Sequence, residues 1–131
     1  MFVNRMDGPV DAETIRRRNP TWEQIEEALL ELNGKDKTLL IIAAGDPVPH
    51  MGIGGGDGKY ICYATEDNSS FDNLENPLAG EGEFVSMVAG GQRSDYRAAL
   101  CVGLDTVVKA AKTYAESGKL EAGLHWKHQG R

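Results

Sequence analysis

Residues 37–65, KTLLIIAAGDPVPHMGIGGGDGKYICYAT, decide the fold of this chain. They begin with an uncharged apolar run at residues 38–44, whose length and composition predict a central strand buried on both faces. A Gly-Asp-Gly sequence centred on Asp57 predicts a tight hairpin turn. The turn would join a weak, glycine-rich strand at residues 51–56 to a strand of β-branched and aromatic residues at 59–65. The segment therefore predicts an antiparallel sheet.

One amphipathic helix is expected on each side of this segment in the sequence. Before it, Thr21 and Gln24 have the spacing of a capping box, and apolar residues then recur at helical intervals until Gly34. This pattern predicts a helix of about twelve residues. In the last third of the chain, Asp105 is the expected N-cap of a second helix and Gly118 is its expected stop.

The other segments complete a simple order of elements. Further strands are expected at residues 83–89, 96–102 and 120–127, a polar loop at 66–82, and a partly irregular N-terminal segment at 1–18. The predicted order is strand, helix, about five antiparallel strands, helix and strand. It indicates the α+β fold class, with a single antiparallel sheet of about five to six strands and two main helices packed on one face. All 131 residues are expected to form a single domain.

Negative charge is concentrated in residues 60–92, which contain six carboxylates and no lysine or arginine. The chain has 14 basic and 20 acidic residues, so this stretch accounts for the whole formal net charge of −6. It predicts an acidic face that repels nucleic acid and anionic lipid and attracts basic partners over a Debye length of roughly 8–10 Å. The six carboxylates are those of Glu66, Asp67, Asp72, Glu75, Glu81 and Glu83.

No pattern in the sequence points to catalysis or to a bound cofactor. The glycine cluster at residues 52–58 leads into a strand rather than a helix, so it does not fit a dinucleotide-binding loop. His125 and His128 are expected on opposite faces of a strand, which does not suit a metal site. Cys62 and Cys101 lie in strand-like runs and are expected to be buried free thiols. We therefore expect no enzymatic activity, no cofactor and no metal.

The N-terminus lacks the apolar core of a secretory signal, and the longest apolar run is too short to span a bilayer. A cytoplasmic location without membrane contact is therefore expected.

The order and spacing of motifs over residues 20–127 resemble those of a known family. The motifs are the first helix from Thr21, the hairpin around Asp57, a second helix containing Tyr114 before a Ser-Gly stop, and a closing strand with Trp126. Together they are similar to the Imm1 family of immunity proteins, which accompany bacterial polymorphic toxins. Tyr114 stands where this family often has phenylalanine, a change that keeps the packing but adds a hydroxyl that needs a partner.

The resemblance implies a protein that binds the toxic domain of a cognate effector and blocks its active site or substrate groove. Toxins paired with this family are varied, with nucleases and nucleic-acid deaminases prominent. A toxin that acts on nucleic acid needs a basic groove for phosphate, so the acidic face is the expected site of contact. No direct binding of nucleic acid is expected, and the oligomeric state is left open.

Tight binding also needs a desolvated anchor, because charge mostly raises the association rate. Phe71 and Leu74, which the acidic loop is expected to expose, are the predicted anchors, although Phe71 could instead fold back onto the sheet edge. The alternative to an immunity protein is a small-molecule-binding or enzymatic α+β domain with a site near the Gly52–Gly56 hairpin. The candidate toxin-binding residues are Asp57, Glu66, Asp67, Phe71, Asp72, Leu74, Glu75, Glu81 and Glu83.

Overall fold

The computed structural model describes residues 2–7, 14–18, 20–35, 37–43, 48–80, 82–89 and 92–130. Within these residues the chain forms nine strands, two α-helices and one short 3-10 helix, η1. In chain order the elements are β1 (Phe2–Asp7), β2 (Thr14–Arg18), α1 (Trp22–Leu30), β3 (Lys37–Ala43), β4 (His50–Gly56), β5 (Lys59–Thr65), β6 (Phe71–Glu75), β7 (Phe84–Ala89), β8 (Gln92–Arg97), η1 (Ala98–Leu100), α2 (Leu104–Ser117) and β9 (His125–Gln129).

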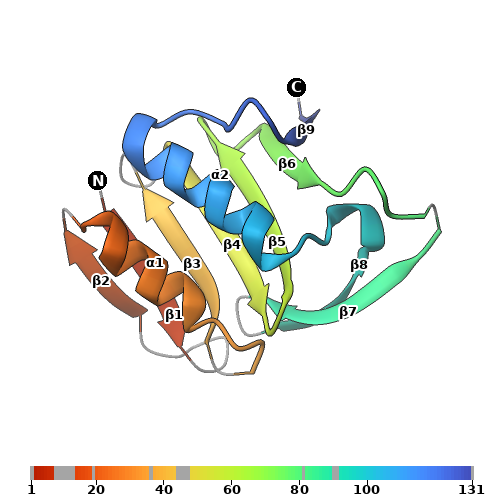
Figure 1. Cartoon of the computed structure of the whole chain (residues 1–131), viewed down its shortest axis with the longest axis horizontal. Helices are drawn as coiled ribbons and strands as arrows, with labels where there is room; N and C mark the ends of the chain where they lie inside the picture. Colours follow the sequence, from red (N-terminus) through yellow and green to blue (C-terminus); the bar gives the residue numbers. More distant parts are fainter. Residues whose placement is uncertain are drawn as a thin grey trace.

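Seven of these strands form one antiparallel sheet in the order β2-β1-β3-β4-β5-β6-β9. Both helices lie on the same face of this sheet (Figure 1). β7 and β8 pair with each other in a separate two-stranded ribbon. The predicted α+β class is therefore confirmed. The ribbon is set apart from the sheet, whereas the sequence predicted one sheet containing every strand.

The helices begin and end at residues that cap them. The Thr21 side chain accepts a hydrogen bond from Gln24 N at 3.2 Å, and Thr21 N donates to Gln24 Oε1 at 2.9 Å, which confirms the capping box. The N-cap of α2 is Gly103 rather than the predicted Asp105. Asp105 lies in the first turn instead, where its carboxylate stabilises the positive end of the helix. Gly118 ends α2 in the left-handed conformation, with φ of 72°.

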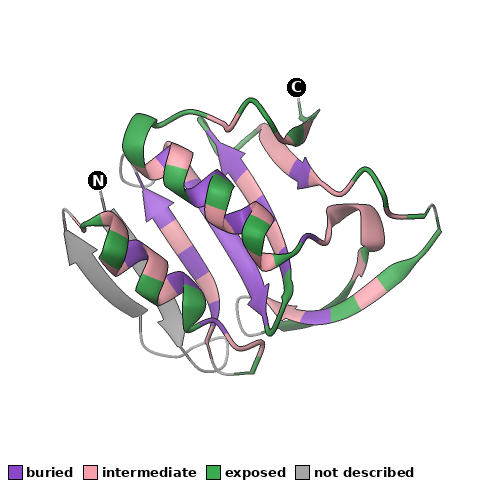
Figure 2. Ribbon diagram, viewed as in Figure 1, coloured by how far each residue is buried: buried purple, intermediate pink, exposed green. Residues whose placement is uncertain are grey.

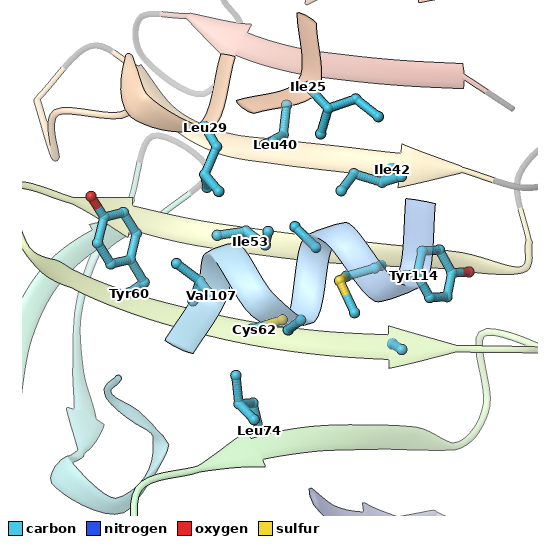
Figure 3. Close-up of a cluster of buried hydrophobic side chains, with 14 of the residues drawn as sticks. Ile25, Leu29, Leu40, Ile42, Ile53, Tyr60, Cys62, Leu74, Val107 and Tyr114 are labelled. Carbon is cyan, nitrogen blue, oxygen red and sulfur yellow. The ribbon is translucent and has the colours of Figure 1, made fainter. Parts of the chain in front are cut away.

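The core lies between the helices and the sheet face that they cover (Figures 2 and 3). Along β3, Leu40 and Ile42 are fully buried, while Leu39 and Ile41 on the opposite face are only half-buried. The prediction that this strand is buried on both faces is therefore wrong, because the helices cover one face alone. The largest fully buried apolar side chains are Ile25, Leu29, Leu40, Ile42, Met51, Ile53, Leu74 and Val107.

Several segments differ from the sequence prediction. α1 has nine residues rather than about twelve, and the strand expected at residues 120–127 is β9, which begins at His125. Residues 71–75, expected within a loop, form β6, because β5 and β9 supply hydrogen-bonding partners for its backbone on both sides. The strand expected at residues 96–102 is replaced by the end of β8 and by η1. In the segment 1–18, expected to be partly irregular, β1 and β2 extend the sheet beyond β3.

Two glycines of β4 allow other groups to pack directly against its backbone. A Cβ at Gly52 would overlap the ring of Tyr63, which is its partner on β5. Gly56 has φ of 146°, and a Cβ there would overlap the backbone of Asn33 and Gly34. The hairpin that was the alternative site for a small molecule is thus closely packed at these two positions.

The cysteines are unpaired thiols: Cys62 is buried, as predicted, and Cys101 is partly exposed. Among the described residues, neither helix has the length and apolar character needed to cross a bilayer. In the same part of the chain, no three histidine, cysteine, aspartate or glutamate side chains are grouped closely enough to hold a metal ion.

Candidate protein-binding surface

The predicted acidic residues lie around β6 and its two connections. Glu66 and Asp67 are exposed in the turn that precedes β6, Asp72 and Glu75 are within the strand, and Glu83 is exposed just before β7. Because β6 separates the turn from the connection to β7, the carboxylates form two groups at its two ends. We call this set of five residues the β6 acidic surface.

Two other predicted acidic residues do not belong to this surface. Asp57 lies in the β4–β5 turn, at the opposite end of β5 from Glu66. Beside it is a hollow of about 250 Å³ whose lining includes Lys35, Lys59 and Arg93, so its surroundings are basic. Glu81 lies outside the described residues.

Asp67 builds the turn between β5 and β6. Its Oδ1 accepts hydrogen bonds from Ser69 N and Ser70 N, each at 2.9 Å. These backbone hydrogen bonds hold the pKa of Asp67 below its usual value. Thr65 Oγ1 donates to Ser70 O at 2.6 Å and closes the same turn. Asp67 is therefore ionised and exposed at neutral pH, in a position that its own turn fixes.

Asp72 is paired within the protein. Its Oδ1 lies 2.9 Å from His128 Nδ1 across the β6–β9 pairing, in which these two residues are directly opposite each other. The contact joins the edge strand β9 to the rest of the sheet through side chains as well as backbone. Asp72 consequently offers a partner less free charge than the exposed Glu66 does.

Glu66 and Asp72 also line a hollow of about 250 Å³ between the β5–β6 turn and the end of α2. Tyr114 of α2 lies at this hollow with 3% of its surface exposed. Burial, and secondarily the negative charge of Glu66, raises the pKa of Tyr114 to about 12. The phenol is therefore neutral at physiological pH, and its negative neighbour adds to the acidic character of this end of β6.

The two predicted apolar anchors are not exposed loop side chains. Leu74 is 1% exposed and belongs to the core (Figure 3), because the register of β6 places it opposite Trp126 on the helix-covered face. The expectation that Leu74 is exposed in a loop is therefore wrong. Phe71 is half-buried, and its ring packs edge-to-face on Tyr63 with the centroids 5.7 Å apart. The alternative in which Phe71 packs back onto the sheet therefore describes this residue.

Sequence reasoning missed the apolar side chains that are exposed near the acidic residues. Leu78 is 92% exposed and Phe84 is 63% exposed. Leu78 stands in a turn-forming sequence of asparagine, proline, alanine and glycine, which favours an exposed side chain. A leucine within such a turn-forming sequence was the feature that could have predicted the exposure of Leu78. Phe84 gave no comparable signal, since it reads as an ordinary strand residue.

Most of the fold matches one known family. Residues 14–128 match the family model described as Immunity protein Imm1. The chain belongs to the Imm1 family of immunity proteins. The resemblance found in the sequence is thereby confirmed, and the match extends from β2 into β9. No curated protein matches the chain.

Membership in Imm1 makes a cognate toxin the partner of this protein. The matched region contains the whole β6 acidic surface, together with Leu78 and Phe84. For an immunity protein, a surface that binds another protein is the functional site, and charge and exposed apolar area are the properties that identify one.

Proposed function

We propose that this protein is a cytoplasmic immunity protein that binds the toxic domain of one cognate effector and blocks its active site or substrate groove. The observation that carries the proposal is the Imm1 match over residues 14–128. Inhibition by stoichiometric binding requires no catalytic group on the inhibitor. It requires a surface complementary to the toxin and a fold that stays intact in the complex.

The toxin is proposed to act on DNA or RNA, as a nuclease or a deaminase. Such an enzyme needs basic side chains to hold phosphate. The β6 acidic surface, in a region of the sequence with six carboxylates and no lysine or arginine, would compete for those side chains. Glu66 and Glu83 are exposed members of this surface. Within the described part of the chain, their side chains neither close a turn, as that of Asp67 does, nor pair across strands, as that of Asp72 does. Their charge would steer the encounter and raise the association rate.

The proposal is tested by co-expression. The probe is the C-terminal toxin domain of a large secreted effector, chosen by sequencing the gene next to that of this protein, and it is produced with and without the immunity protein. We expect the domain alone to stop growth and to damage nucleic acid, and the pair to restore growth. An unrelated toxin domain is the control and should remain toxic. Unchanged toxicity of the neighbouring domain, with both proteins soluble, would overturn the proposed function.

A second measurement addresses the nature of the partner. The purified toxin domain should form a one-to-one complex with the immunity protein, and its activity on DNA or RNA should disappear as the complex forms. A toxin domain with an acidic binding surface, or with activity only on membranes or protein, would contradict the proposed role of the β6 acidic surface.

A further inference from the structure

We propose that Leu78 and Phe84 are the apolar anchors by which this protein holds its toxin, and that they enter an apolar hollow of the toxin bordered by basic side chains. The inference rests on the proposed function and identifies the contact surface. Among the described residues, three large apolar side chains are exposed: Leu30, Leu78 and Phe84. Two of them lie close together in sequence, on the connection from β6 to β7 and at its end.

This connection is held in place by backbone hydrogen bonds to η1. Asn76 N donates to Ala99 O at 2.7 Å, and Ala98 N donates to Glu83 O at 2.8 Å. The two ends of the connection are therefore fixed on consecutive residues of the 3-10 helix. In Figure 1 the described part of the connection leaves β6 toward the start of β7, at the end of the molecule opposite β2. Leu78 and Phe84 are thus carried at one projecting end of the fold.

Leu78 is presented by an ordered turn. Its amide donates to Asn76 Oδ1 at 3.0 Å, and Ala79 N donates to Asn76 O at 3.3 Å. Because the hydrogen bonds already order the backbone of this turn, binding needs to order only the exposed leucine side chain. The unfavourable hydration of the leucine is relieved only when a partner covers it, as expected of an interface anchor.

The charges around this pair specify the chemistry of the partner. Glu75 precedes the connection, and Glu83 adjoins Phe84. The Glu83 carboxylate lies over the connection, since a Cβ at Gly80 would be 3.2 Å from Glu83 Oε1. One cationic residue, Arg97 on β8, is paired directly opposite Phe84. Carboxylates on both sides of an exposed leucine complement a hollow whose border carries lysine or arginine, and a toxin that binds phosphate has such a border.

The experiment measures binding by surface plasmon resonance, and the probe is the toxin domain that the immunity protein neutralises in the co-expression test. Leu78→Ala and Phe84→Ala should each raise Kd by about tenfold or more, mainly through faster dissociation. Leu78→Arg should weaken binding further, because it places a cation against a basic border. Leu30→Ala, on α1, is the matched control for an exposed leucine and should change Kd by less than about twofold.

Thermal unfolding accompanies each variant, and the substitutions should leave it unchanged because the side chains are exposed. If the parent protein binds the toxin domain while Leu78→Ala and Phe84→Ala both retain its Kd, the inference is overturned and the proposed function stands. If the parent protein does not bind the toxin domain, the proposed function fails and the inference fails with it.

Discussion

The ring of Tyr63 on β5 lies across Gly52 on β4 and fills the space that a side chain at residue 52 would need. The ring is held from both sides, edge-to-face against His50 and Phe71, with centroids 5.7 Å apart in each pair. The Tyr63 hydroxyl also lies 3.3 Å from His50 Nε2. This aromatic row connects β4, β5 and β6 on the sheet face that the helices do not cover.

Replacing Gly52 with alanine should therefore destabilise the protein. The added methyl group must displace the Tyr63 ring, which cannot move without losing its contacts with both neighbours. We expect Gly52→Ala to lower the free energy of unfolding by about 1–3 kcal/mol, measured by urea denaturation. Gly123→Ala is the control, because a Cβ there meets only Glu121 Oε2 at 3.5 Å. Equal stability of the two variants would show that the row accommodates a larger residue.

Leu74→Ala should weaken the fold rather than recognition of the toxin. The residue is 1% exposed in the core, so truncation should cost about 2–5 kcal/mol of unfolding free energy. The half-buried Phe71 should cost less when it is truncated. In conditions where both variants are folded, the toxin should bind Leu74→Ala with the parent's dissociation rate. A variant that is as stable as the parent but releases the toxin quickly would return Leu74 to the interface.

Elements with a local sequence signal were predicted correctly, whereas β6, which contains Phe71 and Leu74, was not. The capping box of α1 and the Asp57 turn are local signals, and both elements form where they were expected. β6 has no such signal, because FDNLE is as polar as a loop. It becomes a strand through pairing with β5 and β9, and β9 comes from the far end of the chain. Pairing at that separation is a tertiary effect that local propensity does not contain.

The candidate site was predictable in charge but not in shape. The concentration of carboxylates is a property of the sequence, and most of them do surround β6. Whether a given apolar side chain in that region is exposed depends on the register of β6 and on the bonds to η1. Those long-range contacts bury Leu74 and leave Leu78 exposed. The sequence around Leu74 had predicted that this residue would be exposed.

Acid should loosen the β5–β6 turn through Asp67. Its pKa is lowered in the folded protein by hydrogen bonds from the backbone of Ser70 and Ser69. The stabilisation is therefore present above the ordinary carboxyl pKa of 3.8 and is lost as the pH falls through the lower, folded-state value. Asp67→Asn keeps an acceptor oxygen but does not titrate, so its melting temperature should fall less between pH 5 and pH 2, roughly the range in which paired carboxylates titrate.

The measurement for Asp67 is thermal unfolding across this pH range, with Glu116→Gln as a control for an exposed carboxylate on α2. The parent and Glu116→Gln should lose stability in parallel. An Asp67→Asn protein with the same pH dependence as the parent would mean that the turn does not contribute to acid sensitivity.

Association with the toxin should depend on the carboxylates of the β6 acidic surface that have no structural task. Asp67 fixes a turn and Asp72 pairs with His128, so neutralising them would disturb the fold as well as the charge. Glu66 and Glu75 avoid this difficulty and lie at opposite ends of β6. We expect the double variant Glu66→Gln/Glu75→Gln to associate several times more slowly at low salt and to show a flatter dependence of the association rate on salt.

Stopped-flow mixing with the toxin domain over a salt series measures this effect. The control is the double variant Glu23→Gln/Glu116→Gln, which removes the same charge from the exposed sides of α1 and α2. Both variants change the net charge equally, so a general effect of charge would slow them alike, whereas steering by the β6 acidic surface would slow only the first. The unfolding free energies should stay within about 0.5 kcal/mol of the parent's, because solvent screens exposed charges. If the Glu66/Glu75 variant associates as fast as the control at low salt, the toxin approaches another face of the protein.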